Sequence, residues 1–267
     1  VKRYPDIFFL LKNYDIINQG DSMKKEIVVI GMSGGVDSSV AACLLKEDGY
    51  QVIGATMKLL EDKKTKEAIE DAKKICNQLD IPHYIFDLTK EFKEIVIKNF
   101  ITSYKEDLTP NPCIVCNKYF KFGLFYQKAK ELNATYIATG HYAKVENNRL
   151  IMSDAKEKDQ SYFLCQIDKE VLPYVLFPLN KFNSKDEIRS LAKKYSLPVS
   201  EKKDSQEICF IPNDDYKSFL EKNNMKNTPG NIILKNGKIL GKHNGIYKYT
   251  IGQRKGLNIA FKEPLYV

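Results

Sequence analysis

The 267-residue sequence contains no apolar run long enough to cross a membrane. A membrane-spanning helix needs about 20 consecutive apolar residues, and the longest run near the start, Ile7–Leu11, has five. This run also lacks the length and the small-residue cleavage site of a secretory signal. Apolar residues still make up 43% of the chain, which is enough for a buried core and excludes disorder as the main state. We expect a cytoplasmic protein with no membrane partner.

Arginine and histidine are both scarce. Only four of the 42 basic residues are arginines, and the chain has three histidines. The net charge of +8 is compatible with a nucleic-acid partner, although a lysine-rich solvated surface would give the same surplus. His83, His141 and His243 show no metal-ligand spacing relative to the cysteines, which argues against a zinc site.

Acidic residues are missing from one long stretch, between Leu234 and Lys262. Tyr247 and Tyr249 are interleaved there with seven basic residues, which are Lys235, Lys238, Lys242, Lys248, Arg254, Lys255 and Lys262. A solvated charged face usually mixes both signs. The stretch therefore predicts contact with the phosphates of a nucleic acid.

Internal repeats and low-complexity tracts are absent, and short apolar runs alternate with amphipathic segments. The pattern predicts strands at 27–30, 51–57, 83–88 and 136–138, and helices at 39–47, 65–79, 90–104 and 119–132. β-branched runs of this kind are typical of parallel strands that are buried on both faces. We expect an α/β fold with a parallel sheet between two layers of helices.

Beyond residue 153 the alternation of strands and helices becomes less regular. Beyond Pro229 the sequence shows mainly β-strand patterns. Ser184 and Glu187 form a capping box for a helix that reaches Tyr195. Asn236-Gly237 between two short apolar runs predicts a hairpin. We divide the chain into an extension at 1–22 that is peripheral to the fold, a catalytic domain at 23–215 and a small β-rich basic domain at 216–267.

A glycine- and serine-rich loop follows the first predicted strand and opens a helix. It reads Gly31-Met32-Ser33-Gly34-Gly35-Val36-Asp37-Ser38-Ser39. Inward-pointing N–H groups and the helix N-terminus favour a bound anion there, and Asp37 could hold a Mg²⁺ that bridges phosphate oxygens. The loop lacks the Gly-Lys-Ser/Thr ending of a Walker A motif and is not a dinucleotide GxGxxG.

Two of the six cysteines form a CxxC motif, Cys113 and Cys116. Pro110 and Pro112 predict an extended loop before a helix, whose N-terminus would lower the pKa of a thiol. Cys209 is the lone candidate partner, because Cys43, Cys76 and Cys165 are expected in the core. The motif leaves zinc, a structural pair, sulfur chemistry and an iron–sulfur cluster open.

The string SGGVDSS resembles the PP-loop of ATP pyrophosphatases, which cleave ATP between its α- and β-phosphates. Further segments follow in order: TPNPxxxCN, ATGHY, KDQSYFL, DSxxICFIP and YTIGQRKGL. With them, the chain from about Lys25 to Val267 resembles the tRNA-specific 2-thiouridylases of the MnmA family. The resemblance implies that ATP adenylates the C2 oxygen of the tRNA wobble uridine. A persulfide then delivers sulfur, and AMP leaves.

The resemblance also implies roles for single residues. Cys116 matches the nucleophile, and Cys209 matches the persulfide carrier with which it forms a disulfide. The ATP contacts would be Gly31, Met32, Ser33, Gly34, Gly35, Val36, Asp37, Ser38, Met57 and Gly140. The contacts to the tRNA anticodon stem-loop would be Asn111, Pro112, Cys113, His141, Lys158, Asp159 and Gln160. The cofactors would be ATP and Mg²⁺, and the sulfur would come from a relay such as a cysteine desulfurase.

Two departures from the family pattern stand out. Members often have Asp where Cys113 stands, so Cys113, Cys116 and Cys209 could instead hold an iron–sulfur cluster. The family's C-terminal β-barrel follows the position of Val267, so we expect either a fragment or a version without the barrel. Two rival functions remain. One is an amide-forming PP-loop ligase that uses ammonia, and the other is a non-catalytic iron–sulfur protein that binds RNA.

Overall fold

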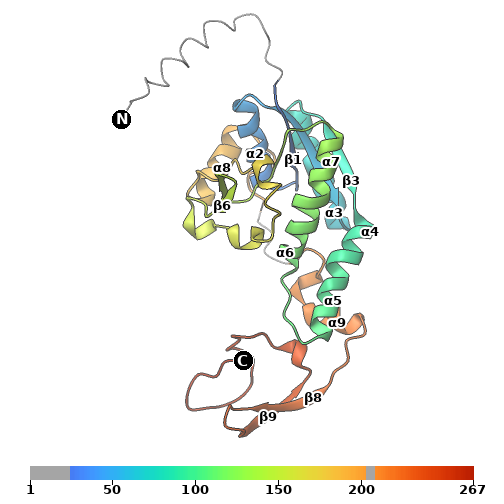
Figure 1. The fold of residues 1–267 in the computed structure, drawn as a ribbon, viewed down its shortest axis with the longest axis vertical. Coiled ribbons are helices and arrows are strands. Elements are labelled where there is room, and N and C mark those ends of the chain that lie inside the picture. Colours follow the sequence, from blue (N-terminus) through green and yellow to red (C-terminus); the bar gives the residue numbers. More distant parts are fainter. Residues whose placement is uncertain (1–24, 203–207) are drawn as a thin grey trace, which may run out of the picture.

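The computed structural model describes residues 25–202 and 208–267, and the predicted extension at 1–22 lies outside them. A parallel sheet in the order β3-β2-β1-β4-β7 forms the centre (Figure 1). Its strands are β1 (Ile27–Gly31), β2 (Gln51–Lys58), β3 (His83–Asp87), β4 (Tyr136–Ala138) and β7 (Val175–Leu176). The expected parallel α/β architecture is confirmed.

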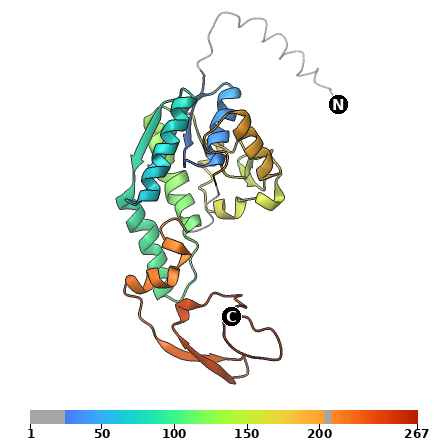
Figure 2. The same ribbon diagram turned by 180° about the vertical axis from the view of Figure 1, so that it is seen from behind.

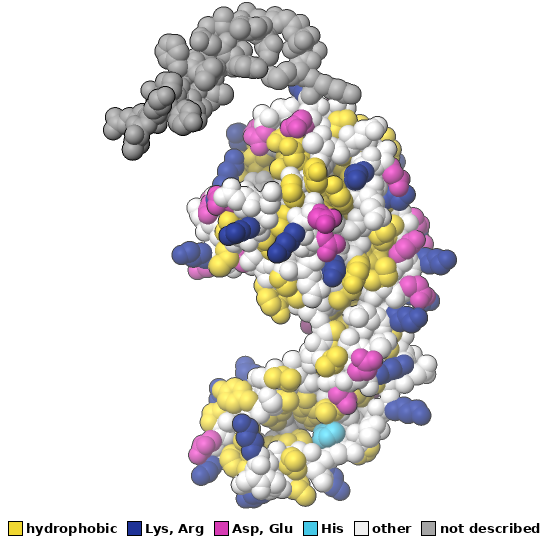
Figure 3. Space-filling view, viewed as in Figure 1, with side chains coloured by type: hydrophobic (Ala, Val, Ile, Leu, Met, Phe, Trp, Pro, Cys, Tyr) yellow, Lys and Arg dark blue, Asp and Glu magenta, His cyan; other side chains and the backbone are white. Residues whose placement is uncertain are grey.

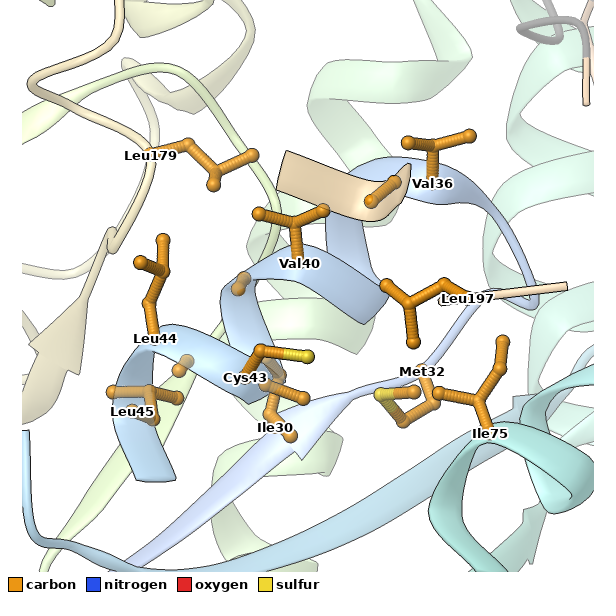
Figure 4. Close-up of a cluster of buried hydrophobic side chains, with 14 of the residues drawn as sticks. Ile30, Met32, Val36, Val40, Cys43, Leu44, Leu45, Ile75, Leu179 and Leu197 are labelled. Atoms are coloured by element: carbon orange, nitrogen blue, oxygen red, sulfur yellow. The ribbon is translucent and has the colours of Figure 1, made fainter. Parts of the chain in front are cut away.

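One face of the sheet is covered by α2 (Val36–Glu47), α3 (Lys63–Gln78) and α8 (Lys185–Lys194). Side chains alternate along β1, so Val28 and Ile30 point into this layer while Val29 points into the other. Figure 4 shows Ile30 next to Cys43 of α2, and Ile75 of α3 beside Met32. The predicted burial of Cys43 and Cys76 is confirmed.

The opposite face packs against a long helix with a π-helical centre. It runs from α6 (Pro112–Cys116) through a π-helical segment (Asn117–Leu124) into α7 (Phe125–Glu131). Phe122 and Phe125 enter the core from this helix. A second such helix comprises α4 (Thr89–Phe92), a π-helical segment (Lys93–Ile97) and α5 (Lys98–Lys105).

The expected extended loop around the CxxC motif is wrong. Helix α6 begins at Pro112, and the side chain of Asn111 accepts a hydrogen bond from the Cys113 N–H at 3.1 Å. Proline is tolerated in the first turn of a helix because the N–H that it lacks would have no partner there. Both cysteines therefore lie within the first turns of the helix, and the expected start at Tyr119 was too late.

Other boundaries differ less. Helix α2 begins at Val36 and not at Ser39. Helix α8 has the predicted cap, because the Ser184 hydroxyl accepts from the Glu187 N–H at 3.2 Å. Cys165 is exposed, which corrects its predicted place in the core: it follows the 3₁₀ turn Ser161–Leu164, and the buried side chain of that turn is Leu164.

The end of the described chain forms a small module with a hairpin. It contains α9 (Tyr216–Lys222) and the antiparallel strands β8 (Pro229–Ile233) and β9 (Ile239–Asn244). The predicted hairpin is confirmed, with Gly237 at a φ of +87° in its turn. A second hairpin, β5 (Lys144–Glu146) and β6 (Arg149–Ile151), packs against the core of the main body through Val145 and Leu150.

The module extends away from the sheet, so the molecule is elongated (Figures 1 and 2). An aromatic cluster joins the two parts: Phe92 and Phe100 of the α4–α5 helix contact Phe210, which also contacts Phe219 of α9. In the space-filling view the surface is hollowed between the body and the hairpin module (Figure 3). No helix within 25–202 and 208–267 is both long and apolar enough to span a bilayer.

Candidate functional site

The site begins where the sheet reverses its strand order. Strands β1 and β4 are neighbours, while the chain continues from β1 to β2 on one side and from β4 to β7 on the other. In open α/β sheets, ligands bind at the carboxyl ends of the strands at such a switch point. The glycine-rich loop after β1 and the turn Thr139-Gly140-His141 after β4 therefore meet at one edge.

The glycine-rich loop presents the uncapped start of α2. Gly35 is the N-cap residue and makes no side-chain cap, so the first N–H groups of this helix remain available to an anion. The Ser38 hydroxyl accepts from the Ser33 N–H at 3.2 Å, and the Ser39 hydroxyl donates to the Gly35 carbonyl at 2.6 Å. These bonds hold the loop in a fixed form.

Two glycines are required for this form. Gly34 has a φ of +67°, and a Cβ there would lie 2.4 Å from the Ala68 carbonyl oxygen. A Cβ on Gly140 would lie 2.8 Å from the Ser38 amide nitrogen. The turn after β4 is therefore pressed against the start of α2, close to where a phosphate would bind.

Asp37 is the carboxylate of this loop, and two side chains hold it. Lys185 donates to both carboxylate oxygens at 2.7 Å, and the Tyr142 hydroxyl donates to one of them at 3.0 Å. Magnesium is usually held by one or two carboxylates together with substrate phosphates, so Asp37 fits as a ligand of Mg²⁺ that arrives with ATP. Lys185 would then leave Asp37 and bind a phosphate.

The remaining residues expected to contact ATP lie around this loop. Met32 and Val36 are buried in the core, so only their backbone can face a ligand. Met57 is half-buried at the end of β2 and packs against two of the core clusters. Lys202 donates to the Gly34 carbonyl at 2.9 Å and to Asp71 at 2.8 Å.

The thiols of Cys113 and Cys116 act on the ionisation of Cys209. Burial is the main reason that the pKa of Cys209 rises to about 12, and the neighbouring Cys116 and Cys113 raise it further. Burial also raises the pKa of Cys116. Residues 93 positions apart in the sequence thus lie close enough to influence each other's ionisation.

The expected low pKa at the start of this helix is therefore wrong for Cys116, since desolvation outweighs the helix N-terminus. Cys209 and Cys113 keep exposed surface, although desolvation raises the pKa of the Cys209 thiol, so reagents can reach this region. The three thiols are not arranged as an iron–sulfur site: within the described ranges, no three His, Cys, Asp or Glu side chains are grouped closely enough to hold a metal.

His141 lies between the two halves of the site. Its Nδ1 is 2.8 Å from the Thr139 hydroxyl and its Nε2 is 3.3 Å from the ammonium of Lys121. Burial and then the charge of Lys121 hold the pKa of His141 well below its usual value. The imidazole is therefore neutral near pH 7.

The loop that carries Asp159 and Gln160 is held by its own hydrogen bonds. Asp159 accepts from the Ser153 N–H at 2.7 Å, and Gln160 accepts from the Tyr142 N–H at 3.0 Å. Both side chains therefore shape the loop between β6 and Leu164. Lys158 ends the short 3₁₀ turn before them and is exposed.

Asn117 links the cysteine helix to this loop. Its side-chain amide donates to the Phe163 carbonyl at 2.8 Å, and the residue is 2% exposed. Its Oδ1 is the one buried side-chain polar atom without a partner among the described residues. This bond fixes the helix that begins with the two cysteines against the turn that follows Gln160.

Sequence reasoning missed Lys121, Lys185 and Tyr142. Lys185 carried one usable signal, because it is the first residue of α8, where a positive charge opposes the helix dipole. A lysine at the start of a helix therefore predicts a nearby anion that compensates its charge. Lys121 and Tyr142 gave no comparable signal.

Comparisons with known proteins were made with this geometry in hand. Residues 26–213 match the family described as "tRNA methyl transferase HUP domain", and residues 217–267 match "tRNA methyl transferase PRC-barrel domain". Together these two matches extend over most of the chain.

Two named relatives have amino-acid sequences similar to that of this chain. A "tRNA-specific 2-thiouridylase MnmA" of Trichlorobacter lovleyi is 47% identical over an alignment of 251 residues that covers 90% of this chain and 70% of that protein. The protein of the same name from Caldicellulosiruptor saccharolyticus is 49% identical over 262 residues, covering 92% and 72%. Among solved structures, an NMN synthetase from Francisella tularensis aligns with a TM-score of 0.42 and 18% identity, over 68% of this chain and 67% of that one.

Proposed function

The chain belongs to the MnmA family of tRNA-specific 2-thiouridylases, and from this membership we propose that it is an ATP-dependent tRNA uridine 2-sulfurtransferase. The proposal is supported by the uncapped start of α2 after β1 and by the position of Cys116 on the helix that packs against the same sheet. The loop supplies the anion site that ATP needs, and the thiols of Cys116 and Cys209 supply the groups that sulfur transfer needs.

The first step would activate the uracil. The C2 oxygen attacks the α-phosphorus of ATP, and pyrophosphate leaves from the α–β bond. The N–H groups at the start of α2 and the ammonium of Lys185 would bind the phosphates that carry the negative charge. Mg²⁺ held by Asp37 would neutralise part of that charge. The step is needed because an oxide is a poor leaving group and AMP is a good one.

The second step would deliver sulfur. The terminal sulfur of a persulfide on Cys209 attacks C2, a C–S bond forms, and AMP leaves with the former C2 oxygen. The Cys116 thiolate then attacks the Cys209 sulfur. The S–S bond of the persulfide breaks, the sulfur stays on the uracil, and a Cys116–Cys209 disulfide forms. A dithiol reductant must reduce that disulfide before the next turnover.

The remaining assignments follow the same proposal. Asn111, Pro112, Cys113 and His141 would surround the wobble base, and Lys158, Asp159 and Gln160 would contact the anticodon stem-loop. The acid-free stretch of the hairpin module would bind phosphates. The sulfur would come from a cysteine-desulfurase relay in the cytoplasm, and the division at residues 215 and 216 stays a prediction.

The alternatives have less support. The description of the matching family names methyl transfer, but the two relatives are named as thiouridylases, and paired thiols serve sulfur transfer. An amide-forming ligase needs no paired cysteines. A cluster-based mechanism does not fit the present arrangement of the three thiols, and no step here depends on a cluster.

The experiment incubates the purified protein with tRNA, ATP and a persulfide donor, and analyses nucleosides by mass spectrometry. We expect 2-thiouridine together with stoichiometric AMP, and neither product from Cys116→Ser or Cys209→Ser. Cys165→Ser is the matched control, because this exposed thiol is not among the groups that act on Cys116 and Cys209. Full activity of Cys116→Ser would favour the ligase reading, and absence of 2-thiouridine with folded protein would remove the proposal.

A further inference from the structure

Lys121 is an unusual cation within the site. It is half-buried on the cysteine helix, and in the part of the chain that the structure describes no acidic side chain forms an ion pair with it. A half-buried ammonium without a counter-ion loses part of its hydration without a compensating charge. Its surroundings should therefore contain a group that becomes negative during function.

The π-helical segment decides where Lys121 points. Lys121 lies five residues after Cys116, and the helix between them is π-helical from Asn117. In an α-helix, side chains five apart diverge by roughly 140° around the axis. In a π-helix each N–H bonds five residues back, so side chains five apart lie nearly above one another. The irregularity brings Lys121 to the side of Cys116.

His141 holds Lys121 without neutralising it. An ammonium only donates hydrogen bonds, so the Nε2 of His141 must accept at 3.3 Å. The ring proton is then on Nδ1 and is donated to the Thr139 hydroxyl at 2.8 Å. A carboxylate in this place would cancel the positive charge, whereas a neutral imidazole fixes its position and leaves it available.

The groups left to respond to that charge are sulfurs. Cys116 lies one π-helical turn before Lys121, and the charge of Lys121 favours the ionised form of Cys116 and of Cys209 against the effect of burial. The other titratable groups facing these two thiols are Cys113 and each other, and His141 faces Lys121. Lys121 is thus the positively charged side chain that acts on Cys116 and Cys209.

We propose that Lys121 stabilises the anionic sulfur that forms at Cys116 and Cys209, and so acts as an electrostatic residue of sulfur transfer. The inference rests on the proposed function for its purpose, because anionic sulfur arises twice in that reaction. One anion is the ionised terminal sulfur of the Cys209 persulfide. The other is the Cys116 thiolate that attacks Cys209. Lys121 forms and breaks no covalent bond in either event.

The test compares Lys121→Met, Lys121→Arg and Lys118→Met with the unchanged protein. Lys118 is the matched control, since it is on the same helix and its ammonium lies 5.3 Å from the ring centre of Tyr119. Each protein is alkylated with iodoacetamide near neutral pH without tRNA or ATP, and the rate at each cysteine is followed by peptide mass spectrometry. Exposed Cys165 is the internal reference.

We expect Lys121→Met to slow alkylation of Cys116 and Cys209 by about fivefold or more, because only the thiolate reacts and its fraction falls about tenfold per pKa unit. Lys121→Arg should keep both rates within about twofold of the starting protein, and Lys118→Met and the Cys165 rate should not change. Circular dichroism checks the fold, and Lys121→Gln replaces any Lys121→Met protein that does not fold.

Unchanged alkylation of both thiols in folded Lys121→Met would overturn the inference, as would an equal loss in Lys118→Met. Formation of 2-thiouridine is measured separately on the same proteins, and its rate should fall in Lys121→Met while the KM for ATP stays the same. A set of proteins with the expected alkylation pattern but no 2-thiouridine in any of them would support the role of Lys121 and contradict the proposed function.

Discussion

The ammonium of Lys185 lies 2.7 Å from both carboxylate oxygens of Asp37, although 148 positions separate the two residues. One residue begins α8 and the other belongs to the first turn of α2. The pair therefore joins two helix starts, each of which carries partial positive charge. A phosphate that binds here meets three sources of positive potential.

Replacement of Lys185 should weaken ATP binding. We expect Lys185→Met to raise the Kd for a non-hydrolysable ATP analogue about tenfold, or about 1.4 kcal/mol, measured by titration calorimetry. Lys193→Met is the control on the same helix, since its pair with Glu201 lies on the surface and such pairs contribute little. An equal Kd in the two variants would contradict the role given to Lys185.

Gly140 should tolerate no side chain. A Cβ there would lie 2.8 Å from the Ser38 amide nitrogen, so Gly140→Ala must push the turn away from α2. We expect a loss of about 1–3 kcal/mol in the free energy of unfolding, as for other overpacked sites, together with loss of ATP binding. Gly241→Ala is the control, because its Cβ would meet Ile259 at an ordinary 3.9 Å. Urea unfolding of both variants gives the comparison.

The sequence predicted four strands of the sheet, most of the helices and the glycine loop, because these follow from local periodicity and turn chemistry, but it missed the two-residue strand β7. It did not predict the helical start at Pro112, where the capping by Asn111 outweighed the presence of two prolines. Nor could it place Lys121, because in a regular α-helix that residue faces away from Cys116. Contacts between distant segments, such as Lys185 with Asp37, depend on tertiary packing that no local pattern encodes.

Asn117 should stabilise the fold through one hydrogen bond. We expect Asn117→Ala to lower the free energy of unfolding by about 0.5–1.5 kcal/mol, because the hydrogen bond to the Phe163 carbonyl is lost. Asn117→Asp should be no better, since a carboxylate cannot donate this bond. Asn77→Ala, at an exposed helical position, should change the value by less than about 0.5 kcal/mol. A stable Asn117→Asp protein would argue that another contact matters.

Cys113 should be replaceable by an acidic residue. In Cys113→Asp the carboxylate would lie in the first turn of α6, where negative charge is favourable. We expect 2-thiouridine formation within about threefold of the starting rate, or about 0.7 kcal/mol. Complete loss of activity, with the fold intact, would instead indicate that all three thiols act together.

Alkaline pH should destabilise the protein through its buried thiols. Burial raises the pKa of Cys76 to about 11, whereas an unfolded thiol titrates near 8.5. A raised folded pKa means that the contribution is complete below about pH 8.5 and is lost as pH rises toward 11. We expect a loss of about 2–3 kcal/mol from this one thiol. The difference in free energy of unfolding between the starting protein and Cys76→Ala should narrow as the pH rises toward 11. A difference that stays constant as the pH rises would contradict this prediction.

Phe210 has consequences for how such proteins can be recombined. Its ring contacts Phe92 and Phe100 from the first matched region and Phe219 from the second, so one aromatic core spans the junction. The two regions therefore cannot be exchanged freely between relatives. A chimera would have to match these rings across the junction, or the hairpin module would lose its fixed orientation relative to the nucleotide loop.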